Sequence, residues 1–319
     1  MTKNLHRLLW KFLSVIHHWD FAYFLPWLAS LPLWLGYPLS QWRGKLQGLI
    51  GKDWRSVALG FRHIWRQTER SLQLMFPATS TYQRQKWRAG RYAAEARDEY
   101  DAQLIAQKKI DAFTCVMHPS SLANIAHDRK TGLLLLTPQY ESALIGIPFL
   151  ARCGGKINCM TSSVTHDPRV DPAVKAHFDK KYRGLEQYTN SGKFIDMELG
   201  MRPFYRMLEA HETLVVLADA PTSSQGVSQL VKFVGATRQL AGGALRMALA
   251  TNSEISGYLC RCIGPGQYEM YLHPPMSAND PMAIQSIYDF FSKVLYQDPG
   301  GWWAVDLLNH MQHPNSENL

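Results

Sequence analysis

Cysteine is scarce in this sequence, and no motif pairs the cysteines that are present. The 319 residues include 5 cysteines, an odd number, and none forms a C-x-x-C pair. The pattern excludes a disulfide framework and favours reduced cytosolic thiols that are mostly buried in strands. Cys260 and Cys262 flank Arg261, but two alternate residues of one strand are a poor ligand set for a metal ion. We expect neither a metal nor a cofactor.

The usual signals of a nucleic-acid-binding protein are also missing. The sequence has no zinc-finger spacing, no RNP-like segment and no dense run of Lys and Arg. Its formal net charge of +8 nevertheless predicts an acidic partner or surface. Because nucleic acid is disfavoured, an anionic membrane surface is the preferred partner.

Charged side chains are absent from Phe21 to Trp42. A segment of this length is long enough to cross a bilayer. However, Pro26, Pro32 and Pro38 interrupt it, and each proline removes a helical hydrogen bond. The pattern therefore favours a kinked or re-entrant hairpin lying in the membrane interface at least as much as a straight spanning helix.

Tryptophan is concentrated at the start of the chain, where eight of the ten tryptophans lie in the first 87 residues. Indole rings gather at membrane–water interfaces, and basic residues lie on both sides of the uncharged segment. An aromatic-rich core helix of a soluble protein is the alternative interpretation. We expect residues 1–45 to anchor the chain on the cytoplasmic face of the inner membrane, ahead of an α/β domain over 46–319.

Two helices are predicted next, over 54–75 and from Thr79 to about residue 107. The second is expected to present mostly a solvated face, or to extend a basic surface toward lipid, through Arg84, Lys86, Arg88, Arg91 and Arg97. From Thr131 onward, strand and helix patterns alternate, which predicts a mostly parallel central sheet flanked by helices. The predicted strands cover 133–136, 156–162, 185–189, 213–218, 231–235, 254–262 and 268–273. The predicted helices cover 141–152, 171–182, 200–210, 242–251, 284–296 and 302–310.

The turn after the first of these strands is the leading candidate for a functional site. Leu133–Leu136 is a short apolar run typical of a buried parallel strand, and Pro138 ends it. A turn between a buried strand and a helix N-terminus lies where α/β enzymes place their chemistry. The polar residues of this turn are Thr137, Gln139, Tyr140, Glu141 and Ser142.

Several short blocks further along the chain carry a resemblance to a known family. They are Asp219 at the end of an apolar strand, the run Lys232-Phe233-Val234-Gly235, a small-residue helix over 242–252, His273-Pro274-Pro275, and the upstream Met75-Phe76-Pro77. Over residues 50–305 the chain resembles the late acyltransferases of lipid A biosynthesis, in the lysophospholipid acyltransferase-like superfamily. The resemblance implies a glycerolipid acyltransferase-like fold. It also implies a membrane-associated enzyme that moves an acyl (or aminoacyl) group from an acyl carrier protein or coenzyme A thioester to a membrane lipid or glycolipid.

The most specific motif of that family is absent. Its members carry a His and an Asp or Glu separated by four residues, and the His takes a proton from the acceptor hydroxyl. Here Pro138 and Ala143 take those places, or Gln139 and Leu144 if the register shifts by one. The resemblance therefore implies a divergent member with a non-standard site. The alternative is a catalytically inactive membrane binding or scaffold protein with the same fold.

Glu141 is the one carboxylate in the turn, so we expect it to act as the base if burial raises its pKa. Gln139 and Tyr140 are expected to line the site beside it. The other interpretation is that Glu141 favours the dipole of the following helix and that its neighbours only pack the turn. His166 and Asp171 have the His-x4-acid spacing and form an alternative catalytic pair, although Asp171 is also an ordinary helix N-cap before a proline.

Four residues are predicted to bind substrate. Arg183 is the candidate to hold a phosphate or a developing oxyanion, with a solvated helix charge as the alternative. Asp219 ends a very apolar strand, which favours a role at the site over a simple loop cap. Thr137 is predicted to bind substrate because it lies in the turn. Lys232 is predicted to do so because it belongs to the block Lys232-Phe233-Val234-Gly235 that carries the resemblance.

Overall fold

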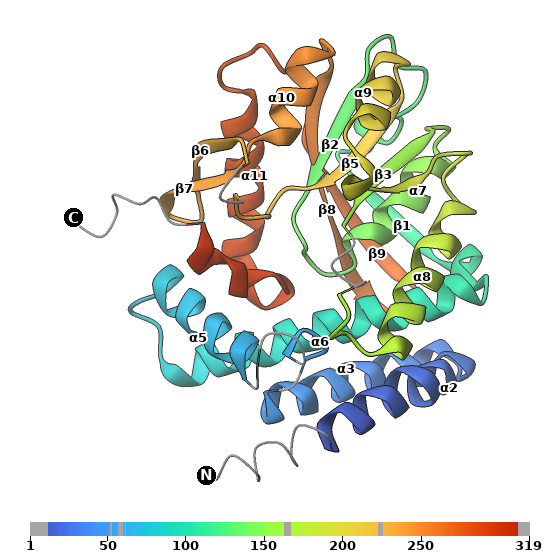
Figure 1. Cartoon of the computed structure of the whole chain (residues 1–319), viewed down its shortest axis with the longest axis vertical. Helices are drawn as coiled ribbons and strands as arrows, with labels where there is room; N and C mark the ends of the chain where they lie inside the picture. The colour runs from blue at the N-terminus through green and yellow to red at the C-terminus, as the bar shows by residue number, and fades with distance from the viewer. Residues whose placement is uncertain are drawn as a thin grey trace.

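An eight-stranded sheet runs through the centre of the molecule (Figure 1). This computed structural model describes residues 12–51, 53–56, 60, 62–162, 167–222 and 226–311. The pairings from β8 across to β4 are parallel, and β9 runs antiparallel to β8, which confirms the mostly parallel sheet. In spatial order the strands are β1 (Thr114–His118), β9 (Gln267–Leu272), β8 (Glu254–Gly264), β2 (Leu133–Thr137), β5 (Thr213–Leu217), β3 (Ile157–Thr161) and β4 (Phe194–Asp196), with β10 (Met276–Ser277) on β8.

Helices cover both faces of this sheet. One face packs against α7 and α8, and the other packs against α9, α10 and α11. A separate antiparallel ribbon joins β6 (Ser228–Phe233) to β7 (Ala236–Ala241). The α-helices with described bounds are α2 (Leu25–Ser30), α3 (Leu33–Ile50), α5 (His63–Met75), α6 (Thr81–Ala106), α7 (Gly146–Arg152), α8 (Pro172–Glu186), α9 (Arg202–Glu209), α10 (Gly243–Ala250) and α11 (Ala283–Gln297).

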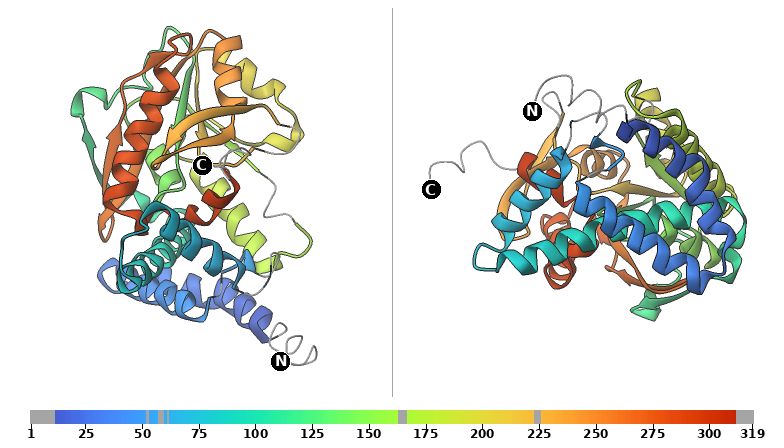
Figure 2. Two further views of the ribbon diagram at one scale, coloured as in Figure 1. Left: turned by 90° about the vertical axis from the view of Figure 1, so that its left-hand side faces the viewer. Right: turned by 90° about the horizontal axis from the view of Figure 1, so that it is seen from below.

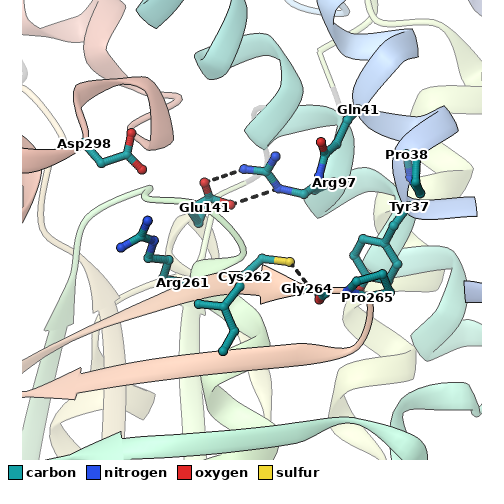
Figure 3. A pocket seen from close by; sticks show the side chains of 11 residues that line it. Tyr37, Pro38, Gln41, Arg97, Glu141, Arg261, Cys262, Gly264, Pro265 and Asp298 are labelled. Atoms are coloured by element: carbon teal, nitrogen blue, oxygen red, sulfur yellow. Dashed lines mark hydrogen bonds and ion pairs between the residues drawn. The ribbon is translucent and has the colours of Figure 1, made fainter. Parts of the chain in front are cut away.

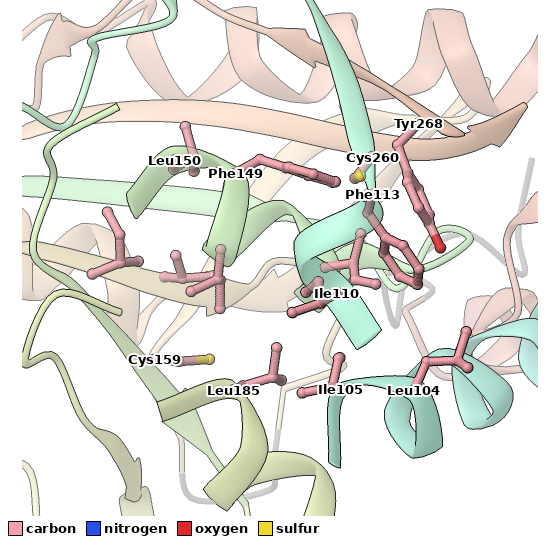
Figure 4. Packing of buried hydrophobic residues seen from close by; sticks show 14 of the residues in the cluster. Leu104, Ile105, Ile110, Phe113, Phe149, Leu150, Cys159, Leu185, Cys260 and Tyr268 are labelled. Atoms are coloured by element: carbon pink, nitrogen blue, oxygen red, sulfur yellow. The ribbon is translucent and has the colours of Figure 1, made fainter. Parts of the chain in front are cut away.

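Strand β2 lies in the middle of the sheet and is buried throughout. Leu133 and Leu135 pack into the hydrophobic cluster beneath α7 and α8, part of which Figure 4 shows. Leu134 and Leu136 pack into the cluster on the opposite face. A continuous run of leucines fits this position, because a central parallel strand is covered on both sides.

The N-terminal helices form a layer at the carboxyl ends of the parallel strands (Figures 1 and 2). The long helix α6 crosses these strand ends, and it begins where the Oγ atom of Ser80 accepts a hydrogen bond from the backbone N–H of Gln83 at 3.2 Å. Helices α2 and α3 lie on the outer side of α6. This places α6 between the sheet and the outer helices.

The prediction that α6 presents mostly a solvated face is wrong. Most of the helix from Arg91 to Ile105 is buried, including the charged residues Arg91, Glu95, Asp98, Glu99 and Asp101. Burial of these charges is tolerated because they are paired and hydrogen-bonded. The partners come from other elements: Asp53 for Arg91, Lys181 of α8 for Asp98 and Arg43 of α3 for Glu99.

Helix α3 packs closely on α6 through small residues. Gly36, Ser40, Gly44 and Gly48 are spaced four apart and form one ridge of the helix, as ridge-in-groove packing requires. A Cβ atom at Gly44 would fall against the backbone carbonyl of Tyr92. The opposite side of α3 is exposed and apolar, with Trp34, Trp42 and Leu49 at its surface.

The uncharged segment 21–42 folds back on itself as a helical hairpin. Its first arm contains a π-helical turn (Asp20–Phe24) and α2. The helix is interrupted at Leu31-Pro32, and α3 forms the second arm. No helix in the described ranges is both long enough and apolar enough to cross a membrane. The predicted boundary between residues 45 and 46 lies within α3, and the anchoring role of residues 1–45 stays a prediction.

Several predicted elements differ from the observed ones for local reasons. The helix expected over 141–152 begins later, as a 3-10 turn (Ala143–Ile145) followed by α7, because Glu141 has a φ of 48°. The strand expected over 185–189 is wrong, since α8 continues to Glu186 and the strand that follows is β4. The helix expected from residue 54 begins at His63, and the last predicted helix is a 3-10 helix (Val305–His310). Strands β1, β4, β7 and β10 were not predicted.

The close approach of α3 and α6 gives a first testable expectation. Gly44→Ala should destabilise the protein by roughly 1–3 kcal/mol, even though Ala favours helices, because the added methyl group meets the backbone of α6. The control is Gly243→Ala in α10, where an added Cβ atom meets nothing within 4 Å. Chemical denaturation of both variants measures the difference, and equal stabilities would contradict the packing described here.

Candidate active site

The turn that follows β2 lies at the carboxyl edge of the sheet, beneath α6. Thr137 is fully buried, its carbonyl accepts a hydrogen bond from the backbone N–H of Ala218, and its hydroxyl lies 3.3 Å from the carbonyl of Pro138. The next residues form a sharp loop that contacts the segment around Trp302. Thr137 therefore supports the turn from within the core.

Asp219 joins this turn to the C-terminal segment. Its buried carboxylate accepts hydrogen bonds from the backbone N–H of Gln139 at 2.8 Å, from the Gln139 side chain at 3.2 Å and from the indole N–H of Trp302 at 2.7 Å. Burial raises the pKa of Asp219, although these donors oppose the rise. The arrangement gives Gln139 and Asp219 a positioning role in the turn.

Glu141 is buried in a left-handed backbone conformation, with a φ of 48°. Its backbone N–H donates to the carbonyl of Gly301 at 2.8 Å, and its own carbonyl accepts from the indole N–H of Trp303 at 3.2 Å. Both carboxylate oxygens accept hydrogen bonds from Arg97 of α6. Burial raises the pKa of Glu141, and the Arg97 guanidinium opposes the rise.

Tyr140 is also buried, and its hydroxyl donates to a carboxylate oxygen of Asp298 at 3.1 Å. Burial raises the pKa of this phenol, and the nearby Asp298 raises it further. Tyr140 therefore ties the turn to Asp298 from within the core.

A cavity of about 210 Å³ adjoins Glu141 (Figure 3). Arg97 and Glu141 line one part of it, and Arg261 of β8 and Asp298 complete a charged end. Figure 3 places Arg261 on the side of Glu141 away from Arg97. The remaining wall comes from α3 and the end of β8, through Tyr37, Pro38, Gln41, Cys262, Ile263, Gly264 and Pro265.

A buried hydroxyl network supports the turn from behind. Asp101 of α6 accepts hydrogen bonds from the hydroxyls of Ser142 at 2.5 Å and Tyr37 at 2.6 Å, and Tyr37 lies 2.6 Å from the hydroxyl of Tyr268. Burial raises the pKa of Asp101 to about 6, although these hydroxyl groups oppose the rise. The network ties together α3, α6, the turn and β9.

Other predicted site residues lie away from this cavity. The Arg183 side chain is 78% exposed on α8 and faces Asp179 at 4.0 Å. Lys232 is exposed on β6, and the side chain of Gln285 of α11 hydrogen bonds to its backbone N–H and carbonyl. Asp171 caps α8 by accepting from the backbone N–H of Ala173 and also lies 3.1 Å from the ring of His18. His166 lies outside the described residues.

Sequence reasoning missed the residues that come from other elements. Arg97 and Asp101 are four residues apart, so one face of α6 carries both the partner of Glu141 and the partner of Ser142. The spacing of Arg97 and Asp101 could have indicated a shared helix face. No pattern in the sequence around Asp298 or Arg261 indicates that either residue lies at the site. The cysteines are free, and no group of three or more His, Cys, Asp or Glu side chains in the described ranges is arranged to hold a metal ion.

Comparisons with known proteins leave the family open. No family model and no curated protein matches the chain. Among solved structures, the chain is similar to the 1-acyl-sn-glycerophosphate (LPA) acyltransferase PlsC from Thermotoga maritima. The likeness has 14% sequence identity and a TM-score of 0.34, and it covers 85% of this chain and 98% of that one. A likeness of this quality shows neither a shared family nor a shared activity.

The buried carboxylates of α6 predict an unusual dependence of stability on pH. Burial raises the pKa of Asp101 to about 6 and that of Glu99 to about 7, in the second case against its Arg43 partner. Both pKa values in the folded state lie above those in the unfolded chain. The folded state therefore binds more protons at any pH between the unfolded-state and folded-state pKa values. The free energy of unfolding should therefore fall as pH rises from about 4 to 7, with Asp101 contributing on the order of 2–3 kcal/mol.

Denaturation curves at a series of pH values measure this dependence. Asp101→Asn should remove its share of the slope, because the amide does not titrate. Asp111→Asn, at a side chain that is 75% exposed, is the matched control and should leave the slope unchanged. A slope that persists in full in Asp101→Asn would show that another group titrates.

Proposed function

We propose that this protein is a membrane-associated transferase that moves an acyl (or aminoacyl) group from a carrier-protein or coenzyme A thioester to a lipid or glycolipid acceptor. The observation that carries the proposal is Glu141, a buried carboxylate that lines a cavity at the carboxyl edge of a parallel sheet. Carboxylates with a raised pKa in such positions are candidates for general bases. The sequence resemblance to acyltransferases points to the same chemistry.

The ion pair with Arg97 leaves Glu141 able to accept a proton. A carboxylate offers about four lone-pair sites, and the two hydrogen bonds from Arg97 occupy two of them. In the proposed step, Glu141 takes the proton of the acceptor hydroxyl while the oxygen attacks the thioester carbonyl. The carbon–sulfur bond then breaks, the thiolate leaves, and the proton passes from Glu141 to the sulfur.

The other residues of the cavity and of the adjoining turn have supporting roles in this proposal. Arg261 stands across from Arg97 and supplies positive charge for the oxyanion that develops on the thioester carbonyl. Gln139 and Tyr140 are positioning residues, since Asp219 and Asp298 hold them. Thr137 and Asp219 fix the turn, while Arg183 and Lys232 are too exposed to contribute to this cavity.

Membrane association is supported by the exposed face of the helical hairpin. Trp19, Trp27, Trp34 and Trp42 are each at least half exposed on it, which is typical of side chains at a membrane interface. Helix α3 carries two of these tryptophans, and its residues Tyr37, Pro38 and Gln41 line the cavity that contains Glu141, so one helix links the exposed face with the site. The net charge of +8 suits the anionic cytoplasmic face of the inner membrane.

One observation favours the alternative, a catalytically inactive membrane binding or scaffold protein. Arg97 engages both oxygens of Glu141, and no histidine lies in the turn to act as a stronger base. A closed ion pair of this kind also stabilises a site that performs no chemistry. Measurement of turnover separates the two functions.

Glu141→Gln should lower the transfer rate at least tenfold, because general bases contribute roughly 10²–10⁴-fold. The full-length protein would be incubated with acyl-carrier and coenzyme A thioesters and membrane lipids, and the acylated product followed by mass spectrometry. Glu209→Gln, at an exposed position of α9, is the matched control. Arg97→Gln should move the acidic limb of the pH–rate profile to higher pH, because it removes the charge that opposes the rise in the Glu141 pKa.

Other outcomes have definite meanings. Loss of activity in His166→Ala with full activity in Glu141→Gln would assign the chemistry to His166 and Asp171. If wild-type protein consumes no thioester but binds lipid vesicles, the scaffold function holds.

The exposed aromatic face gives a separate expectation. Replacing both Trp34 and Leu49 by Ser should weaken binding to anionic vesicles roughly tenfold or more, equivalent to ~1.4 kcal/mol, because apolar surface no longer enters the interface. Val116→Ser on the edge strand β1 is the control, since this residue is 55% exposed but lies away from the hairpin. Sedimentation with vesicles measures both, and equal binding of the three proteins would remove this face from the membrane contact.

A further inference from the structure

An apolar groove runs between the two arms of the helical hairpin. Its volume is about 630 Å³, roughly the space of twenty water-sized groups, and it lies within the size range of ligand sites. The lining is dominated by large apolar and aromatic side chains. These are Val15, Ile16, Trp19, Tyr23, Phe24 and Trp27 of the first arm and Trp42, Leu46 and Ile50 of α3.

The charged and amide side chains that line the groove are already paired with one another or with α6. Arg43 donates to both carboxylate oxygens of Asp20, at 2.8 and 2.6 Å, and to Glu99 at 2.5 Å. Gln47 donates to Asp20 at 3.1 Å. These three side chains therefore need no partner from a ligand, and the apolar remainder of the lining suits an alkyl chain. Among the described lining residues, Arg43 is the one cation, and its pairing with Asp20 and Glu99 leaves it unavailable to the carboxylate of a free fatty acid.

The surface around the groove is apolar as well. Trp34 is 70% exposed and Leu49 is 73% exposed on the same helix, but neither lines the groove. Trp19, Trp27 and Trp42 line the groove and also belong to the exposed face that we assign to the membrane, so the groove is continuous with that face. The net charge of +8 complements an anionic lipid surface rather than a second copy of this basic chain.

We infer that the groove binds one acyl chain of an anionic membrane phospholipid, whose head group stays at the membrane surface. The inference rests on the membrane association proposed above. A chain lifted into the groove exchanges the lipid interior for an aromatic and aliphatic lining, so little apolar surface is exposed to water. The chain also fills the space between the arms and holds the hairpin on the bilayer.

Photocrosslinking tests this occupancy separately from membrane binding. Full-length protein would be added to phosphatidylglycerol vesicles in which one acyl chain carries a mid-chain diazirine, irradiated, and mapped by peptide mass spectrometry. Sedimentation with the same vesicles measures membrane association. We expect one crosslinked lipid per protein, with the attachment sites in the groove rather than at Trp34 or Leu49.

Two matched Leu→Trp substitutions on helices provide the comparison. Leu46→Trp fills the groove and should lower groove crosslinking roughly tenfold while sedimentation changes less than about twofold, because overpacking excludes the chain and the outer face remains. Leu249→Trp adds the same side chain at a similarly exposed position of α10, outside the hairpin, and should leave both measurements unchanged. Equal effects of the two substitutions would overturn the inference.

Other occupants give distinct results, each of which also overturns it. Saturable groove crosslinking by a monomeric diazirine fatty acid would assign the site to free fatty acid. Groove crosslinking that requires removal of residues 1–11 would show that the chain's own N-terminal segment fills the groove. A dimer in solution that Leu46→Trp dissociates would show that a second copy covers it. If the wild-type protein fails to sediment with vesicles, membrane association fails and the inference falls with it.

Discussion

The structure depends on the pairing of charges that are buried along α6. A lone ion in this layer would cost several kcal/mol, and removing one partner of a buried pair typically costs 3–5 kcal/mol. Three of the pairs join α6 to different parts of the chain: Arg43 of α3 to Glu99, Lys181 of α8 to Asp98, and Glu141 of the turn to Arg97. The helical layer and the sheet are therefore held together by interactions that are expensive to break.

The same constraint determines the geometry of the candidate active site. Glu141 takes a left-handed backbone conformation that few non-glycine residues adopt, and Gly301, Trp303 and Arg97 stabilise it there. Asp219 holds Gln139, which lies two residues before Glu141. The position of one carboxylate thus follows from contacts with α6, the end of β5 and the C-terminal segment.

Much of the sheet could be predicted because its signal is local. The leucine run of β2, the apolar run of β5 and the helical pattern of α11 each mark their own element. The burial of α6 could not be predicted in this way, since a helix rich in Arg, Glu and Asp has the same local pattern whether its charges meet water or distant partners. Asp219 was placed at the carboxyl edge correctly, but its partner Trp302 lies 83 residues further along the chain. The edge strand β1 lacks a strong apolar pattern, because its residues are exposed or only partly buried.

Different sides of helix α3 pack on α6, line the cavity and face outward. Its small residues allow contact with α6, Tyr37 and Gln41 form part of the cavity wall, and its tryptophans face outward. The membrane anchor that we propose here is therefore not an interchangeable module. A generic transmembrane helix grafted in its place would attach the protein to the membrane. It would also remove a wall of the cavity and the hydrogen bond that the Tyr37 hydroxyl donates to Asp101.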